Sequence, residues 1–137
     1  MGKIYFYKTD EPYGEFSNFS NHPIYLDGVY WATVEHYFQS NKFFNNHHMT
    51  VQLAKTPFEA AQLGRSRAFP IRPDWEAIKD EVMKKGVFKK IEMHASVREL
   101  LLGTGELEIV EHTENDFYWG DGGDGSGLNK FGKILME

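Results

Sequence analysis

The segment 31–43 constrains the fold more than any other part of the sequence, because it pairs helical periodicity with a polar neighbouring face. Val34, Tyr37, Phe38 and Phe44 recur at helical spacing and form an apolar stripe. The spacing therefore predicts an amphipathic helix whose stripe faces other parts of the protein.

The polar face of this helix carries Glu35, Gln39 and Lys42, whose spacings of four and three residues line up their side chains. Thr33 is a good N-cap, which places Glu35 in the first turn, where the helix dipole stabilises a carboxylate. An acid, an amide and an ammonium among aromatic residues suit a small polar substrate. The alternative is an ordinary solvated surface, and this segment taken alone favours that alternative.

Turn and capping signals divide the rest of the chain into short elements. Thr56-Pro57-Phe58-Glu59 and Ser96-Val97-Arg98-Glu99 are typical capping boxes, while Gly64 and Gly103 are predicted to end the helices that follow them. The expected elements are strands 4–7 and 107–110, a hairpin 24–31 turning at Asp27-Gly28, and helices over 34–43, 49–55, 57–64, 74–93, 96–103 and 129–136. The sequence predicts a mainly helical α+β single domain over residues 1–137 with a few short strands.

Composition sets limits on location and partners. The 137 residues contain no cysteine, which excludes a thiolate nucleophile and fits a reducing compartment, and the N-terminus shows neither a signal peptide nor a membrane span. We therefore expect a cytoplasmic protein without membrane contact. The net charge of −5 argues against broad non-specific binding of nucleic acid.

Basic and aromatic residues in the segment 65–75 are candidates for ligand binding. Arg65, Arg67 and Arg72 suit a phosphate, although each also fits a solvated basic loop. Trp75 follows a proline and an N-cap aspartate, and it suits stacking on a base as well as it suits a core anchor.

A glycine-rich segment, residues 119–127, carries Asp121 and Asp124. Its glycines let the backbone approach a phosphate, and we expect the segment to close over the substrate, with ligand contacts supplying the ordering energy. The alternative is a mobile surface turn. The aspartates lack the further oxygen ligands of a calcium loop, and the six histidines lack metal-binding spacing. His47 and His48 are expected to be exposed. We predict no metal and no cofactor.

Taken in order, the motifs resemble those of the YbiA-like N-glycosidases, the NADAR family. The resemblance covers nearly the whole chain. It rests on Glu15-Phe-Ser-Asn-Phe19, Trp31-Ala-Thr-Val-Glu-His-Tyr-Phe-Gln39 with Lys42-Phe43, Leu63-Gly64-Arg65, Arg72-Pro-Asp-Trp75, Leu101-Leu-Gly-Thr104 with Glu111, and Trp119-Gly-Asp121 through Gly127-Leu-Asn-Lys-Phe-Gly132 to Ile134-Leu-Met136. Members commonly continue past Leu135-Met136 with a basic residue, whereas this sequence stops at Glu137.

The resemblance implies hydrolysis of an N-glycosidic bond at a ribose C1. The substrate it implies is either a phosphorylated ribosylamino-pyrimidine intermediate of riboflavin synthesis or ADP-ribosylated guanine in nucleic acid. It assigns catalysis to Glu35 and Asp121. It assigns substrate binding to Trp75, Asn18, Phe19, Lys42, Arg65, Gly120, Asn129 and Lys130.

The competing functional class is a non-catalytic binding module, which would bind ADP-ribose or a nucleotide in the same pocket as the enzyme's substrate. The expected partner is a small ribosyl-phosphate or ADP-ribosyl substrate, with transient contact to ADP-ribosylated nucleic acid as a further option. Whether Glu35 matters for turnover or only for affinity would separate the two classes.

Overall fold

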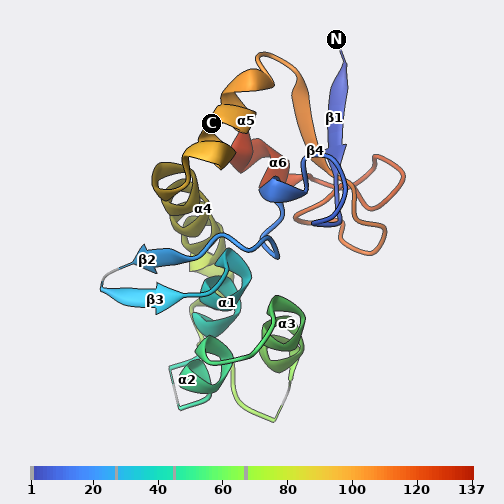
Figure 1. Ribbon diagram of the computed structural model, residues 1–137. Coiled ribbons are helices and arrows are strands. Elements are labelled where there is room, and N and C mark those ends of the chain that lie inside the picture. The colour runs from blue at the N-terminus through green and yellow to red at the C-terminus, as the bar shows by residue number, and fades with distance from the viewer. Residues whose placement is uncertain (1, 27, 45, 67) are drawn as a thin grey trace. The chain divides into compact units, whose positions relative to one another are not determined.

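The computed structural model describes residues 2–26, 28–44, 46–66 and 68–137. Two compact units make up the chain: Asn21–Met93, and Met1–Ser20 together with His94–Glu137. Several helices and two small sheets confirm the predicted α+β class (Figure 1). Among the described residues, no helix combines the length and apolarity that crossing a bilayer requires.

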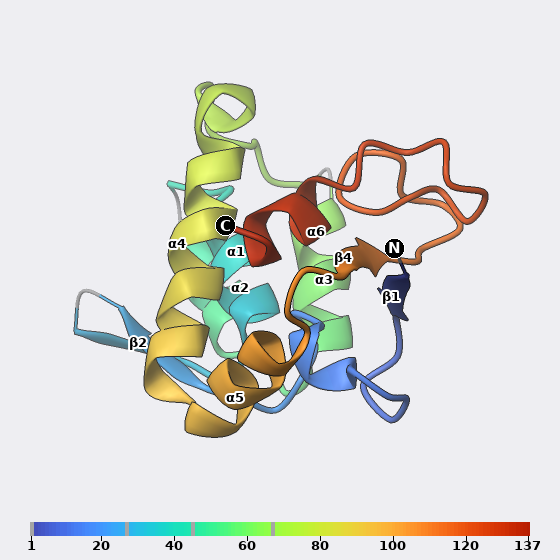
Figure 2. The ribbon, with the colours of Figure 1, turned by 90° about the horizontal axis from the view of Figure 1, so that it is seen from above.

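The unit Asn21–Met93 is built around one short helix. Its elements are the strands β2 (Ile24–Leu26) and β3 (Val29–Trp31) and the helices α1 (Val34–Ser40), α2 (His47–Gln52), α3 (Pro57–Arg65) and α4 (Trp75–Met93). Helix α1 contacts α2, α3 and α4 (Figure 2). All seven of its residues are buried. The predicted amphipathic helix is therefore a central helix with no solvated face.

The start of α1 follows the capping prediction. The Thr33 side chain accepts a hydrogen bond from the His36 amide at 3.2 Å. The His36 ring also contacts the Thr33 hydroxyl at 2.8 Å and the Ala54 carbonyl at 2.9 Å. The predicted C-terminal end is wrong, because α1 stops at Ser40 and Phe44, beyond it, is 70% exposed. The apolar stripe thus ends at Phe38.

Two glycines permit α1 to lie close to its neighbours. A Cβ atom at Gly64 of α3 would overlap the side-chain amide of Gln39, and one at Gly86 of α4 would lie 2.8 Å from the Tyr37 ring. Gly64 lies inside α3, which runs to Arg65, so its predicted role as a helix stop is wrong. Both glycines lack a side chain at a point where two helices meet, which leaves room for the neighbouring residue of α1.

The remaining predictions in this unit follow from local chemistry. Strands β2 and β3 form the expected antiparallel hairpin, with Ile24 opposite Trp31; the turn residue Asp27 lies outside the described residues, as does Arg67. Thr56 caps α3 by accepting from the Glu59 amide at 3.1 Å. A small apolar cluster under α2 and α3 comprises Phe43, Val51, Ala54 and Ala60, with Leu63 and Ile71 packed against it.

The other unit combines the two ends of the chain. Its elements are β1 (Lys3–Phe6), a 3-10 turn (Gly14–Phe16), α5 (Ala95–Gly103), β4 (Glu108–Glu111) and α6 (Lys130–Leu135). Strands β1 and β4 are parallel, and the Phe6 ring packs on those of Phe16 and Phe131. Helix α5 starts at Ala95 with His94 at its N-cap position, so the capping box predicted at Ser96 is wrong, whereas Gly103 is the last helical residue as predicted.

Candidate functional site

Glu35 is a buried carboxylate in the first turn of α1, with only 7% of its surface exposed. The solvated-surface alternative for this face is therefore wrong. One helical turn later, Gln39 donates a hydrogen bond from Nε2 to Glu35 Oε2 at 2.8 Å, and Gln39 is itself 5% exposed. A charged side chain that is buried needs such partners, because burial in an apolar surrounding penalises charge.

Basic residues lie beyond the C-terminal end of α1 and at the end of α3. Lys42 Nζ is 3.5 Å from the Gly64 carbonyl, and the neighbouring Arg65 is exposed at the last position of α3. The Lys42 carbonyl accepts from the Arg72 amide at 2.7 Å, which joins the loop before α4 to the turn after α1. The structure thus brings Lys42 beside the α3 end that carries Arg65.

Arg72 is held by its own neighbours. Its guanidinium binds the Asp74 carboxylate through two hydrogen bonds of 2.6 and 2.9 Å, and it lies 4.1 Å from the centre of the Phe44 ring. The hydrogen bonds from Arg72 lower the pKa of Asp74. This arrangement assigns Arg72 to the loop structure. A phosphate contact of Lys42 or Arg65 stays a prediction.

Trp75 begins α4 and is 6% exposed. Its ring packs on Phe38 of α1, with 5.1 Å between ring centres and 58° between planes. The sequence left two interpretations of Trp75 open, and its burial against Phe38 supports the role of a core residue. A contact with substrate stays a prediction.

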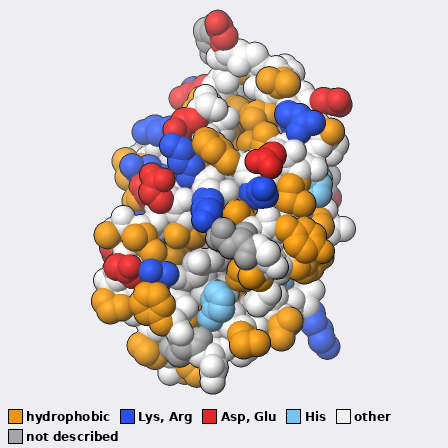
Figure 3. All heavy atoms as spheres, turned by 90° about the vertical axis from the view of Figure 1, so that its left-hand side faces the viewer, with side chains coloured by type: hydrophobic (Ala, Val, Ile, Leu, Met, Phe, Trp, Pro, Cys, Tyr) orange, Lys and Arg blue, Asp and Glu red, His pale blue; other side chains and the backbone are white. Residues whose placement is uncertain are grey.

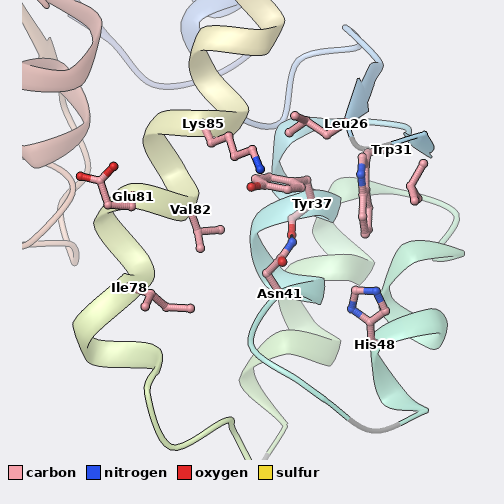
Figure 4. Close-up of a pocket in the computed structure, with 10 residues that line it drawn as sticks. Leu26, Trp31, Tyr37, Asn41, His48, Ile78, Glu81, Val82 and Lys85 are labelled. Carbon is pink, nitrogen blue, oxygen red and sulfur yellow. Dashed lines mark hydrogen bonds between the residues drawn. The ribbon is translucent and has the colours of Figure 1, made fainter.

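A cavity of about 380 Å³ opens on the side of α1 that carries Tyr37 and Asn41 (Figure 4). Residues 37 and 41 lie about 200° around the helix from residues 35 and 39. The cavity is therefore separate from the Glu35 side. Its other lining residues are Leu26, Val29, Trp31, His48, Ile78, Glu81, Val82 and Lys85.

The two neighbouring histidines at the start of α2 are not both exposed as predicted. His47 is 4% exposed, donates from Nε2 to the Leu63 carbonyl over 2.9 Å, and stacks on Phe69. His48 is half-buried and lies 2.9 Å from the Ser40 carbonyl. Both rings connect α2 to its neighbours.

Asp121, in the unit that holds the chain ends, is 4% exposed and paired with His112. His112 Nδ1 lies 2.9 Å from Oδ2 and 3.2 Å from Oδ1, and the Gly123 amide donates to Oδ1 at 2.9 Å. Burial alone would raise the pKa of Asp121, but the hydrogen bonds from His112 and Gly123 outweigh it and hold that pKa below its ordinary value. Asp121 is therefore an ionised acceptor.

His112 was missed by sequence analysis. The Asp121 amide donates to the Glu111 carbonyl at 2.9 Å, so the turn through Gly120 returns the chain to the end of β4, where His112 follows. The two residues are nine apart in the chain and meet only because the turn closes, so no local motif predicts the pair. About half of the His112 side chain is exposed.

The glycine-rich segment is ordered by its own hydrogen bonds. The Gly127 amide donates to the Asp121 carbonyl at 2.8 Å, and the Asn129 amide donates to the Gly120 carbonyl at 2.9 Å. Closure of this segment over a substrate stays a prediction.

Asn129 also ties the segment to β4. Its Oδ1 accepts from the Glu111 amide at 3.0 Å, and its Nδ2 donates to the Ile109 carbonyl at 3.0 Å. These bonds make Asn129 a structural anchor in the described chain.

The remaining predicted contacts lie in the same unit. Asn18 is 7% exposed, Phe19 is half-buried, and Gly120 is packed so closely that a Cβ there would lie 2.8 Å from the Glu111 carbonyl. Lys130 lies at the start of α6, with Nζ 5.8 Å from the centre of the Tyr118 ring. Their contact with substrate stays a prediction. No group of three His, Asp or Glu side chains suited to a metal occurs among the described residues.

Comparison with known proteins identifies the family. A family model described as NADAR domain matches residues 5–137. The chain therefore belongs to the NADAR domain family, as its motifs predict.

Its relatives include two named glycosidases. N-glycosidase YbiA of Escherichia coli (strain K12) is 49% identical over 98% of this chain and 84% of its own length, and N-glycosidase Npun_R5314 of Nostoc punctiforme is 47% identical over 98% and 88%. Riboflavin biosynthesis protein PYRR, chloroplastic, of Zea mays is 40% identical over 98% of this chain and 24% of its own. The NMR structure of E. coli YbiA matches with a TM-score of 0.90 and 48% identity, covering 98% of this chain and 81% of that one.

Proposed function

We propose that this protein is an N-glycosidase that cleaves the C1–N bond of a small phosphorylated ribosylamino-pyrimidine, and that Glu35 is its essential carboxylate. The activity class follows from relatives named N-glycosidase that align over nearly the whole chain. A relative named for riboflavin biosynthesis supports the substrate class. The observation that carries the role of Glu35 is a buried helix-start carboxylate held by an amide.

The chemistry fits a carboxylate of this kind. As the C1–N bond breaks, its electron pair leaves with the nitrogen and C1 of the ribose acquires oxocarbenium-like positive charge. A fixed carboxylate opposes that charge and orients the attacking water, whose oxygen bonds to C1 while its proton passes through Glu35 to the leaving nitrogen. Lys42 and Arg65 bind the substrate phosphate in this proposal, and Trp75 borders the base.

Asp121 has a different role from Glu35 in this proposal. A carboxylate whose pKa is lowered stays ionised near neutral pH, so it accepts hydrogen bonds rather than donating a proton. We assign Asp121 to ribose hydroxyls or to the orientation of His112, and not to protonation of the leaving group. Asn18, Phe19, Gly120, Asn129 and Lys130 remain proposed neighbours of the substrate.

Charge favours the small molecule over nucleic acid. The chain carries a net charge of −5, and positive and negative side chains are interspersed on the face drawn in Figure 3. Binding of a polynucleotide gains most from a continuous basic surface. Cleavage of ADP-ribosylated guanine is the second candidate reaction, which the family resemblance keeps open.

The test is substitution of Glu35 by Gln, which keeps the shape and removes the charge. Turnover should fall on the order of a hundredfold or more, with ligand affinity largely retained. Glu76→Gln is the matched control, because Glu76 also lies in the first turn of a helix but its side chain is 81% exposed. Equal turnover in the Glu35 variant and the control would contradict the catalytic role.

The substrate is identified by supplying both classes to the unaltered protein. A phosphorylated ribosylamino-pyrimidine and an oligonucleotide carrying ADP-ribosyl guanine are incubated separately, and the released base is measured by chromatography. We expect release from the pyrimidine. Binding of ADP-ribose without release of base from either compound would instead indicate a non-catalytic module.

A further inference from the structure

The amide of Gln39 is oriented in a way that ordinary packing does not explain. Its Nε2 donates to Glu35 Oε2, whereas its Oε1 is buried without a hydrogen-bond partner among the described residues. Buried polar atoms without partners are uncommon in native proteins, and each one calls for a reason. An ionised carboxylate supplies that reason, because it accepts from the N–H side of an amide and repels the carbonyl side.

Gly64 makes room for this amide. A Cβ at position 64 would overlap Gln39 Oε1 and lie within 2.9 Å of Gln39 Cβ. Helix α3 therefore approaches α1 at the one turn where Gln39 reaches back to Glu35. A side chain at position 64 would push the amide away from the carboxylate.

We propose that Gln39 is a positioning residue for Glu35 and that Gly64 is the gap in α3 that admits it. The Gln39 amide holds the Glu35 carboxylate in one orientation, so its charge is in place before the C1–N bond breaks. This inference rests on the proposed role of Glu35. An ordinary stabilising pair within α1 is the alternative, and it predicts a loss of stability without a specific loss of rate.

The experiment uses Gln39→Met, which keeps length and removes the donor, and Gly64→Ala, which displaces the amide. Both should lower kcat by about 10- to 100-fold with KM within about threefold, because misplacement of a supporting group acts on the reaction step. The double variant should lose no more kcat than either single one, since both changes act through one hydrogen bond. Rates are measured well below every variant's melting temperature.

Gly86→Ala is the matched control. It introduces the same methyl group on α4, where the new atom would press on Tyr37, on the side of α1 away from Glu35. It should lower the melting temperature and leave kcat of the folded protein unchanged. Gly64→Ala combined with Gln39→Ala should regain part of the melting temperature lost in Gly64→Ala, but not its kcat.

The outcomes separate the two proposals. If Glu35→Gln abolishes turnover but Gln39→Met keeps full kcat, the positioning inference is wrong and the proposed function stands. If Gly86→Ala lowers kcat as much as Gly64→Ala, the effect reflects general packing of α1 and the inference is also overturned. If Glu35→Gln keeps its turnover, the proposed role of Glu35 is wrong, and the positioning inference that rests on it is wrong as well.

Discussion

The charge state of Asp121 depends on two donors that meet it inside one unit of the fold. His112 and the Gly123 amide both hydrogen-bond to its carboxylate, and the pKa of Asp121 lies below the ordinary value of 3.8. Because the folded pKa is lowered, the ionised carboxylate stabilises the fold at pH values above the ordinary pKa. That contribution is lost as pH falls through the lower, folded pKa.

Replacing His112 with Ala should therefore weaken the dependence of stability on acidic pH. Burial raises the pKa of Asp121 and the His112 hydrogen bond opposes that effect, so removal of this donor raises the pKa. Less stability is then lost on acidification below about pH 4. Urea unfolding of both proteins at a series of pH values measures this. Parallel stability curves for the two proteins would mean that His112 does not set the charge of Asp121.

At the scale of elements, α1 and α4 are joined through aromatic packing. Trp75 at the start of α4 is buried against Phe38, while Phe88 further along the same helix is 40% exposed. The two aromatic residues therefore offer a comparison within one helix. Burial of an aromatic ring contributes to stability in proportion to the apolar area removed from water.

Trp75→Ala should destabilise the fold by about 3–5 kcal/mol, because it empties a large buried volume. Phe88→Ala should have a much smaller effect. Thermal and urea unfolding measure both. Trp75→Phe, which keeps most of the packing, then tests the substrate contact: normal affinity in a well-folded Trp75→Phe protein would leave Trp75 with a purely structural role.

At the scale of the whole molecule, the sequence predicts one domain over residues 1–137. Neither small sheet exceeds two strands among the described residues, and an isolated two-stranded sheet is marginally stable in water. The unit with the chain ends is assembled from segments on both sides of Asn21–Met93. We therefore expect the two units to unfold together.

Native-state hydrogen exchange tests this cooperativity. The amides of α1 report on one unit and those of β4 on the other, and in a single domain both should reach the same maximal opening free energy. Differential scanning calorimetry should show one transition. Two transitions, with α1 and β4 exchanging at different limits, would divide the chain into two domains.

Local chemistry in the sequence determined much of this protein. Thr33 and Thr56 begin helices as predicted because a side-chain oxygen caps the amides that follow, and this depends only on neighbouring residues. The hairpin of β2 and β3, predicted from its Asp27-Gly28 turn signal, the family motifs and Glu35 as a candidate are likewise readable without coordinates.

Tertiary structure alone decided what the remaining residues do. By sequence alone, Gly64 and Gly86 are typical of the ends or interruptions of helices. Both instead lie inside helices, at points where α1 approaches closely. Only the contact between helices shows why a side chain is absent there. Burial of Glu35, the direction of the Gln39 amide and the pairing of His112 with Asp121 depend on residues far away or on a turn closing. Interactions within a few residues are encoded locally, whereas burial and charge depend on the packing that surrounds each group.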